Sequence, residues 1–208
     1  MSDGIRGKAA VIGTGISDIG VVPDRSYLDL MGQAMHAALA DAGLKKSDID
    51  GVFCATSGGG LNAVTASEYL GIQPKVIEGT MLGGSSFINF LQWAALALDA
   101  GLCDVALIAY GSNLRTGAGR MNIAPHPWEA AYKLRNPPAS YALAAARHMH
   151  EYGTTREQMA EVAVAARGWA QMNPIAFKRD PLSIEDVLAS RMLIDPLSVG
   201  DCCLVTDG

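Results

Sequence analysis

Charged residues are scarce in this sequence, and positive charge is the scarcer sign. Of 208 residues, 18% are charged, with 16 lysines and arginines against 21 aspartates and glutamates, and the formal net charge is -5. A mildly acidic protein has no general attraction for nucleic acid or for an anionic membrane surface. We therefore expect any anionic ligand to be held by local arginines or by the amino-terminal ends of helices.

The sequence also lacks a long uninterrupted apolar run. The most apolar stretch, residues 87–110, is broken by Asp99, Gly101 and Asp104, so it predicts a buried helix and a buried strand rather than a membrane span. The first residues show no basic region followed by an apolar one, and none of the four cysteines (positions 54, 103, 202 and 203) forms a CxxC pair. These features predict a reduced, cytoplasmic protein.

Half of the residues are hydrophobic, which is enough for a sizeable core, and their pattern alternates between strands and helices. Short apolar runs predict strands at residues 8–12, 51–55, 75–79 and 105–110, and residues 201–206 resemble the start of another. Helices are predicted at residues 26–42, 66–70, 87–100, 139–152, 155–172 and 183–190. Such alternation predicts an α/β fold.

Two of these helices carry strong signals. Ser26 and Asp29 form a capping pattern at the start of the first helix, and Gly43 is a left-handed cap at its end. The helix at residues 87–100 is apolar nearly all round, so we expect it to lie buried between layers.

A glycine pair after the first predicted strand suggests a dinucleotide-binding loop. Gly13 and Gly15 fit that motif, but position 18 is Asp18 rather than a third glycine, and the next helix begins only near Ser26. We prefer a turn at the end of a strand.

Histidines give one candidate site. His148 and His150 are two residues apart on a predicted helix, so they point to different faces and cannot share a metal ion. No metal site is therefore predicted. His126 lies between two prolines in a region without helical or strand periodicity, and it is a candidate for a substrate pocket.

The most informative site is the junction at residues 83–86 (GGSS), between a predicted strand and the apolar helix. Backbone N–H groups and the helix dipole stabilise negative charge at such a junction, so Gly84, Ser85 and Ser86 are the candidate catalytic residues. Either serine is a nucleophile, if a base reaches it in space, or one of them is simply the N-cap of the helix. No histidine lies nearby in sequence, which favours the N-cap.

The order of these segments resembles the thiolase superfamily, above all the sterol-carrier-protein thiolases and their lipid-transfer-like relatives. No single segment decides this, but their order and spacing do. The segments that carry the resemblance are residues 8–15 (KAAVIGTG), 41–44 (DAGL), 48–52 (DIDGV), 100–110 (AGLCDVALIAY), 141–158 (YALAAARHMHEYGTTREQ), 173–176 (NPIA), 195–197 (DPL) and 201–208 (DCCLVTDG).

This resemblance implies a thiolase-like fold, with layers in the order αβαβα, of which the chain is the amino-terminal half. Residues 1–111 would be the α/β core, residues 112–190 an inserted loop domain, and residues 191–208 the return to the core. The fifth strand would begin at Cys202 and be incomplete. The family's second half, which supplies a histidine, usually an asparagine and a second cysteine, has no counterpart in this sequence.

The resemblance also implies that the nucleophilic cysteine of active members falls at Gly84. A glycine pair there resembles lipid-transfer-like members that act as aldolases on acyl-CoA thioesters and work with an OB-fold partner protein. We therefore expect retro-aldol cleavage of a carbon–carbon bond, with a coenzyme A thioester as substrate and no covalently bound cofactor. The alternatives are an acetyl-CoA acyltransferase, and a noncatalytic acyl-CoA or lipid carrier or supporting subunit.

Two further expectations follow from the family. Acyl-CoA would bind across the loop domain with its phosphates near one or more of Arg115, Arg120 and Arg147, unless these arginines are solvated or paired with Glu129 and Glu151. The protein would be at least a dimer, because the family pairs its third strands, here residues 75–79, across a twofold axis.

Overall fold

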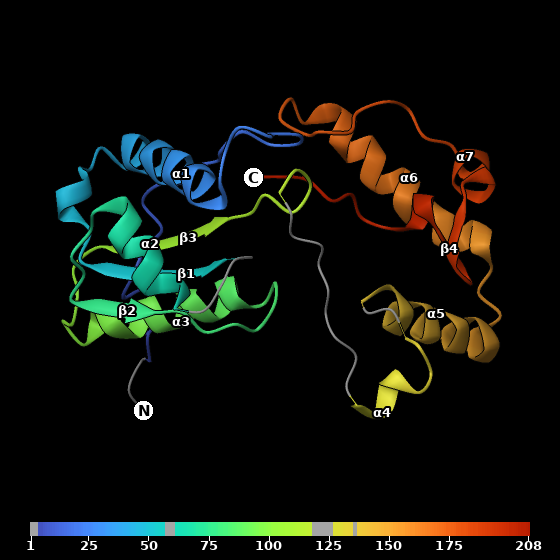
Figure 1. Ribbon diagram of the computed structural model, residues 1–208, viewed down its shortest axis with the longest axis horizontal. Coiled ribbons are helices and arrows are strands. Elements are labelled where there is room, and N and C mark those ends of the chain that lie inside the picture. The colour runs from blue at the N-terminus through green and yellow to red at the C-terminus, as the bar shows by residue number, and fades with distance from the viewer. Residues whose placement is uncertain (1–3, 57–60, 118–126, 135–136) are drawn as a thin grey trace. The chain divides into compact units, whose positions relative to one another are not determined.

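The computed structural model describes residues 4–56, 61–117, 127–134 and 137–208 (Figure 1). The chain forms two compact units: the first comprises Met1–Arg120 and Thr206–Gly208, and the second comprises Met121–Val205. The family-based boundaries at residues 112 and 190 stay a prediction. No helix within the described ranges is long and apolar enough to cross a membrane.

A parallel sheet of three strands organises the first unit. The strands are β1 (Gly51–Thr56), β2 (Val76–Glu78) and β3 (Ala106–Gly111), in the order β2-β1-β3. The residue that begins β1, Gly51, is in register with Val76 of β2 and Ala106 of β3. The strands predicted at residues 51–55, 75–79 and 105–110 are thereby confirmed.

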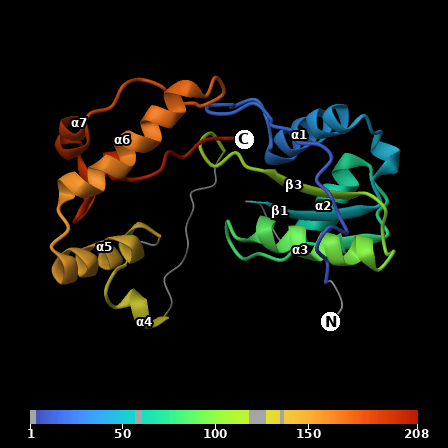
Figure 2. The ribbon, with the colours of Figure 1, turned by 180° about the vertical axis from the view of Figure 1, so that it is seen from behind.

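Helices cover both faces of this sheet (Figures 1 and 2). Helices α1 (Tyr27–Ala42) and α2 (Asn62–Leu70) pack on one face, and α3 (Ser86–Asp99) packs against β1 and β3 on the other. A short 3₁₀ turn, η1 (Lys46–Asp48), precedes β1. This layered arrangement confirms the predicted α/β class.

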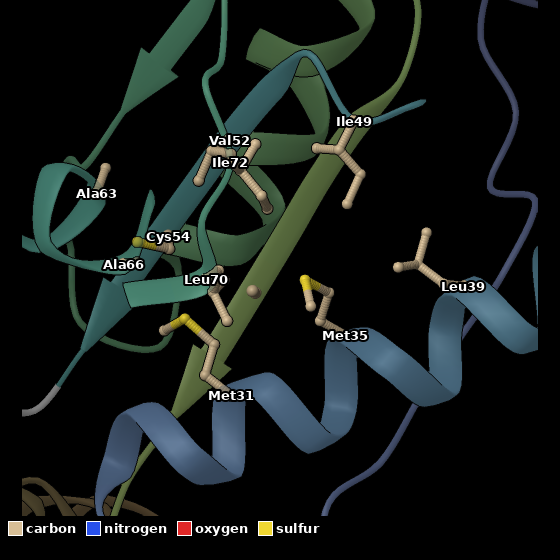
Figure 3. Close-up of a cluster of buried hydrophobic side chains, with 11 residues drawn as sticks. Met31, Met35, Leu39, Ile49, Val52, Cys54, Ala63, Ala66, Leu70 and Ile72 are labelled. Atoms are coloured by element: carbon tan, nitrogen blue, oxygen red, sulfur yellow. The ribbon is translucent and has the colours of Figure 1, made fainter. Parts of the chain in front are cut away.

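The core divides between the two faces of β1 because successive side chains of a strand point to opposite sides. Val52 and Cys54 face α1 and α2, in a cluster that Figure 3 shows together with Met31 and Met35 of α1. On the other face, Phe53 and Ala55 pack with three buried residues of α3: Phe90, Ala94 and Ala97.

The ends of α1 follow the predicted local chemistry. The Ser26 hydroxyl accepts from the Asp29 N–H, and the Asp29 carboxylate accepts from the Ser26 N–H at 2.8 Å. Gly43 ends the helix at φ 67°, in the left-handed region that favours glycine. Both features confirm the predicted capping box and cap.

The second unit is mainly helical. It contains α4 (Pro127–Ala130), α5 (Pro138–Tyr152), α6 (Arg156–Met172) and α7 (Ile184–Ala189), followed by the antiparallel pair β4 (Met192–Ile194) and β5 (Leu197–Ser198) and the 3₁₀ turn η2 (Val199–Asp201). The helices predicted at residues 139–152, 155–172 and 183–190 are confirmed. The β4–β5 pair was not predicted, since its strands are too short to show a period.

Two predicted strands do not form. Residues 8–12 belong to no strand, and Val11 and Ile12 are largely exposed. An apolar run predicts burial, but a strand also needs a ladder with a neighbour, and the ladders of the described sheet join only β1 to β2 and β1 to β3. Residues 202–206, the expected fifth strand, likewise form no strand, and only Asp207 bridges, to Gly20.

The Gly13–Gly15 pair lies against α1. A Cβ on Gly13 would lie 2.4 Å from the carbonyl oxygen of Ala38, and a Cβ on Gly15 would lie 2.1 Å from that of Ala34. Glycine is therefore required at both positions by close packing on a helix. This geometry explains the pair without a nucleotide.

Helix α3 is less buried than predicted. Phe90 is fully buried, but Ile88 is 71% exposed and Trp93 50% exposed. The expectation that α3 lies between layers is wrong for the described chain, because the sheet covers only one of its sides. A helix that is apolar nearly all round is typical of one that is covered on both sides.

A single carboxylate, that of Asp50, holds the starts of the three strands together. It accepts from the N–H groups of Asp104 and Val105, both at 2.9 Å, and pairs with Lys75 at 2.8 Å. Partial burial acts to raise its pKa, but the bonds from Lys75, Val105 and Asp104 outweigh it, so the pKa lies below its ordinary value of 3.8.

We predict that Asp50→Asn lowers the free energy of unfolding by about 1–3 kcal/mol at pH 7. Because the folded-state pKa is lowered, this contribution is complete above the unfolded-state pKa and is lost as the pH falls through the folded-state pKa. Urea unfolding of the full-length protein at pH 7 and near pH 3 measures both effects.

Asp104→Asn is the matched control, since the Asp104 side chain is 87% exposed and lies 3.6 Å from the same lysine. Its expected effect is below about 0.5 kcal/mol. Equal losses for the two variants would contradict the role given to Asp50.

Candidate functional site

The loop between β2 and α3 is built by hydrogen bonds of its own residues. The Glu78 carboxylate accepts from the N–H groups of Gly79 at 2.9 Å and Thr80 at 2.8 Å, and also from the Thr80 hydroxyl. The Thr80 hydroxyl bond, followed by the backbone bonds, lowers the pKa of Glu78. The carboxylate thus stays ionised and fixes the first turn after the strand.

The end of the same loop is pinned by Ser86. Its hydroxyl oxygen accepts from the N–H of Leu82 at 2.8 Å, its own N–H donates to the carbonyl of Gly83 at 3.1 Å, and its side chain is fully buried. A buried hydroxyl engaged in this way holds the loop closed. The nucleophile interpretation of Ser86 therefore has no support in this geometry.

Gly84 and Ser85 lie at the start of α3, which is the positive end of the helix dipole. Ser85 is the N-cap residue, with φ -73° and no hydrogen bond from its side chain, and both residues are exposed. An isolated β-bridge between Leu82 and Gly84 tightens the backbone just before the helix. Backbone N–H groups at a helix start are, in general, suited to binding an anion.

The space at Gly84 does not explain why it is glycine. A Cβ built there meets no heavy atom within 4 Å, and its backbone is outside the left-handed region. The neighbouring Gly83 has equal space, but its φ is 62° and favours glycine. A cysteine side chain would therefore fit at position 84 without strain.

The two cysteines of the sheet unit, Cys54 and Cys103, do not replace that thiol. Cys54 and Cys103 are buried in the two core clusters, and burial raises the pKa of Cys54 to about 11. Burial, together with nearby Asp50 and Asp104, also raises the pKa of Cys103. A thiol with a raised pKa is a poor nucleophile at neutral pH.

The predicted phosphate-binding arginines belong to different units. Arg115 follows β3 in the first unit and has an exposed side chain. Arg147, on α5 of the second unit, forms an ion pair and a hydrogen bond with Glu151, which is the pairing considered as the alternative. Arg120 and His126 lie outside the described residues.

Sequence reasoning missed one residue beside Arg115. Asp207 is fully buried, and its carboxylate accepts from the N–H groups of Val22, Arg115 and Thr116. The only sequence signal was an Asp-Gly pair inside the segment 201–208.

His148 is exposed, and its Nδ1 lies 3.0 Å from the Thr154 hydroxyl. Among the described residues, no group of three or more histidine, cysteine, aspartate or glutamate side chains is placed to hold a metal ion.

The chain is similar in sequence to known proteins. No family model matches it. It is 34% identical over 216 residues to a steroid side-chain-cleaving aldolase of Thermomonospora curvata, covering 97% of this chain and 55% of the relative. It is 33% identical over 218 residues to 17-hydroxy-3-oxo-4-pregnene-20-carboxyl-CoA lyase of Mycobacterium tuberculosis, covering 98% and 56%.

The structural comparison agrees. The solved Ltp2-ChsH2(DUF35) aldolase matches with a TM-score of 0.82 and 33% identity over 98% of this chain and 54% of that chain. The chain thus spans about half the length of the relatives it matches.

Sequence and fold together define the class: the chain belongs to the thiolase superfamily. Within this superfamily it falls among the sterol-carrier-protein-thiolase and lipid-transfer-like proteins, the group that the sequence segments predicted.

Position 84 gives a direct test of this site. We predict that Gly84→Ala changes the free energy of unfolding by less than about 0.5 kcal/mol, whereas Gly83→Ala destabilises by about 1–2 kcal/mol because of its left-handed backbone. Gly84→Cys should introduce a thiol that iodoacetamide alkylates rapidly at pH 7, since a helix start lowers thiol pKa.

Peptide mapping after brief alkylation measures the reactivity and carries its own control. Cys54 and Cys103 should stay unlabelled in the folded Gly84→Cys protein. An introduced thiol that reacts no faster than the thiol of Cys54 would contradict the geometry described for the start of α3.

Proposed function

We propose that the protein containing this chain cleaves a carbon–carbon bond of an acyl-CoA thioester by a retro-aldol reaction, without a cysteine acyl-enzyme. The observation that carries the proposal is the junction at Gly84, which lies at the start of α3 and has no thiol. The names of the two relatives above, an aldolase and a CoA lyase, support it.

The proposed substrate has a hydroxyl group on the β-carbon of the acyl chain. A base removes the hydroxyl proton, a carbonyl forms at the β-carbon, and the bond between the α- and β-carbons breaks. The electron pair of that bond moves into the thioester as an enolate, which is then protonated at the α-carbon. The products are a ketone or aldehyde and a shortened acyl-CoA, so atoms and electrons balance without an oxidant.

The N–H groups of Gly84 and Ser85 are proposed to bind the enolate oxygen. Such donors stabilise negative charge as it develops and contribute about 3–4 kcal/mol each. The base and acid are proposed to come from the second unit or from the half that the relatives have in addition. His126 stays a proposal for the substrate pocket.

Ser85→Pro is a sharp test, because proline removes the N–H while its fixed φ of about -65° is close to the -73° of Ser85. The full-length enzyme should lose about 100- to 1000-fold in kcat for release of the carbonyl product. Ser85→Ala, which keeps the N–H, should stay within a few-fold. Equal activity of the two variants would contradict an oxyanion role for this N–H.

The same assay separates the alternatives when intact mass is measured during turnover. The proposal expects shortened acyl-CoA and no protein adduct. An acyl adduct mapped to Ser85 or Ser86 would instead make the protein an acyltransferase. Tight acyl-CoA binding without turnover, with any partner protein present, would make it a carrier or supporting subunit.

Coenzyme A phosphates are proposed to bind near one or more of Arg115, Arg120 and Arg147. An acidic protein needs local guanidinium groups to hold a polyanion. Replacing all three with alanine should weaken coenzyme A binding by at least about 10-fold, measured by calorimetry on the full-length protein.

A charge-matched control distinguishes specific contacts from the loss of net charge. It replaces three other exposed arginines, Arg6, Arg25 and Arg179, and should leave the affinity within about twofold. Unchanged affinity in the first triple variant would rule the phosphate contacts out.

The proposed assembly is a cytoplasmic homodimer, or larger, that works with an OB-fold partner. Strand β2 is an edge of the sheet and its Ile77 is 44% exposed, which suits pairing with a second copy. Light scattering on the full-length protein should give at least twice the chain mass, and Ile77→Lys should reduce it. A monomer at micromolar concentration would contradict the dimer.

A further inference from the structure

A buried carboxylate fixes the backbone of the loop that carries Arg115. One oxygen of Asp207 accepts from the N–H groups of Arg115 at 2.9 Å and Thr116 at 3.2 Å, and the other accepts from the N–H of Val22 at 2.9 Å. The side chain has no solvent exposure. Three backbone donors from two distant segments therefore converge on one anion.

Backbone hydrogen bonds also hold the last two residues of the chain beside Gly20 and Ser112. Asp207 and Gly20 exchange two backbone hydrogen bonds at 3.0 Å, and Ser112 and Gly208 exchange two, at 3.0 and 2.9 Å. In Figures 1 and 2 the end of the chain accordingly lies beside the loop that follows β3. The loop is thus bonded at Ser112, Arg115 and Thr116.

Arg115 combines a fixed backbone with an exposed side chain. Long cationic side chains lose less freedom on binding when the backbone beneath them is already ordered. Burial acts to raise the pKa of Asp207, but the bonds from Val22, Thr116 and Arg115 outweigh it and keep the pKa below its ordinary value. The carboxylate is therefore ionised at neutral pH and holds its donors strongly.

We propose that Asp207 is a positioning residue for phosphate binding: through the N–H of Arg115 it sets where the Arg115 guanidinium meets the phosphates of coenzyme A. This inference rests on the proposed function, in which Arg115 is a phosphate contact. Asp207 touches no ligand itself, and its effect on binding passes through Arg115.

A double-mutant cycle on the full-length protein tests this coupling, with coenzyme A as the probe and calorimetry as the measurement. Arg115→Ala and Asp207→Asn should each weaken binding by about 5- to 10-fold. The double variant should bind no more than about twofold more weakly than Arg115→Ala alone, because the second change has nothing left to position.

Asp50→Asn is the matched control. Asp50 also accepts two backbone N–H groups, but at the opposite ends of the strands, so it should lower stability and leave coenzyme A affinity unchanged. If Asp207→Asn does not fold, Thr116→Val replaces it in the cycle. That change removes the hydroxyl bonded to Asp207 and to the Val22 carbonyl while keeping the Thr116 N–H.

The remaining outcomes overturn the inference in distinguishable ways. A loss with Arg115→Ala but none with Asp207→Asn or Thr116→Val would reject positioning and leave the phosphate contact intact. Additive losses would show that Asp207 acts by another route. No loss with Arg115→Ala would reject both this inference and the proposed contact.

Discussion

The burial of both faces of β1 is the constraint on which the first unit depends. Its odd and even residues enter two different clusters, and both of its edges are bonded to parallel neighbours. A strand surrounded in this way fixes the helices on both sides of the sheet. Because all three strands run in one direction, the loops that follow β2 and β3 leave from the same edge, where α/β proteins place their ligands.

Local chemistry made much of this fold predictable from the sequence. The ends of α1 could be predicted because helix caps act through bonds within one turn. The signals are a serine three residues before an aspartate and a glycine after an apolar stretch. Strand formation depends on a partner distant in sequence. Residues 8–12 have the composition of a strand, yet they form no ladder with β1, β2 or β3.

The candidate site, too, could be predicted from the sequence only in part. The place of Gly84 came from a family spacing, and the exposed N–H groups fit a helix start. The acceptor role of Ser86 and the buried position of Asp207 depend on contacts that no short motif records. Asp207 lies 92 residues from Arg115 in the chain, so their bond appears only once the fold is known.

Under the proposed function, glycine at position 84 removes a nucleophilic side chain from the junction without altering its backbone. The dipole of α3 and the N–H groups of Gly84 and Ser85 are properties of the backbone, and they persist whatever side chain position 84 carries. A thioester bound there, as we propose, would meet charge stabilisation and no attacking side chain at position 84. The proposed chemistry is accordingly one in which the thioester accepts electrons and keeps its coenzyme A.

The pairing of Ser112 with Gly208 has a consequence for how this chain tolerates change. The second unit leaves the first after this pairing and returns just before it, so the two ends of the insertion are fastened side by side. Closing a loop whose ends already meet costs little more entropy when the loop is lengthened. On this argument, a change in the length of the second unit should cost the first unit little stability.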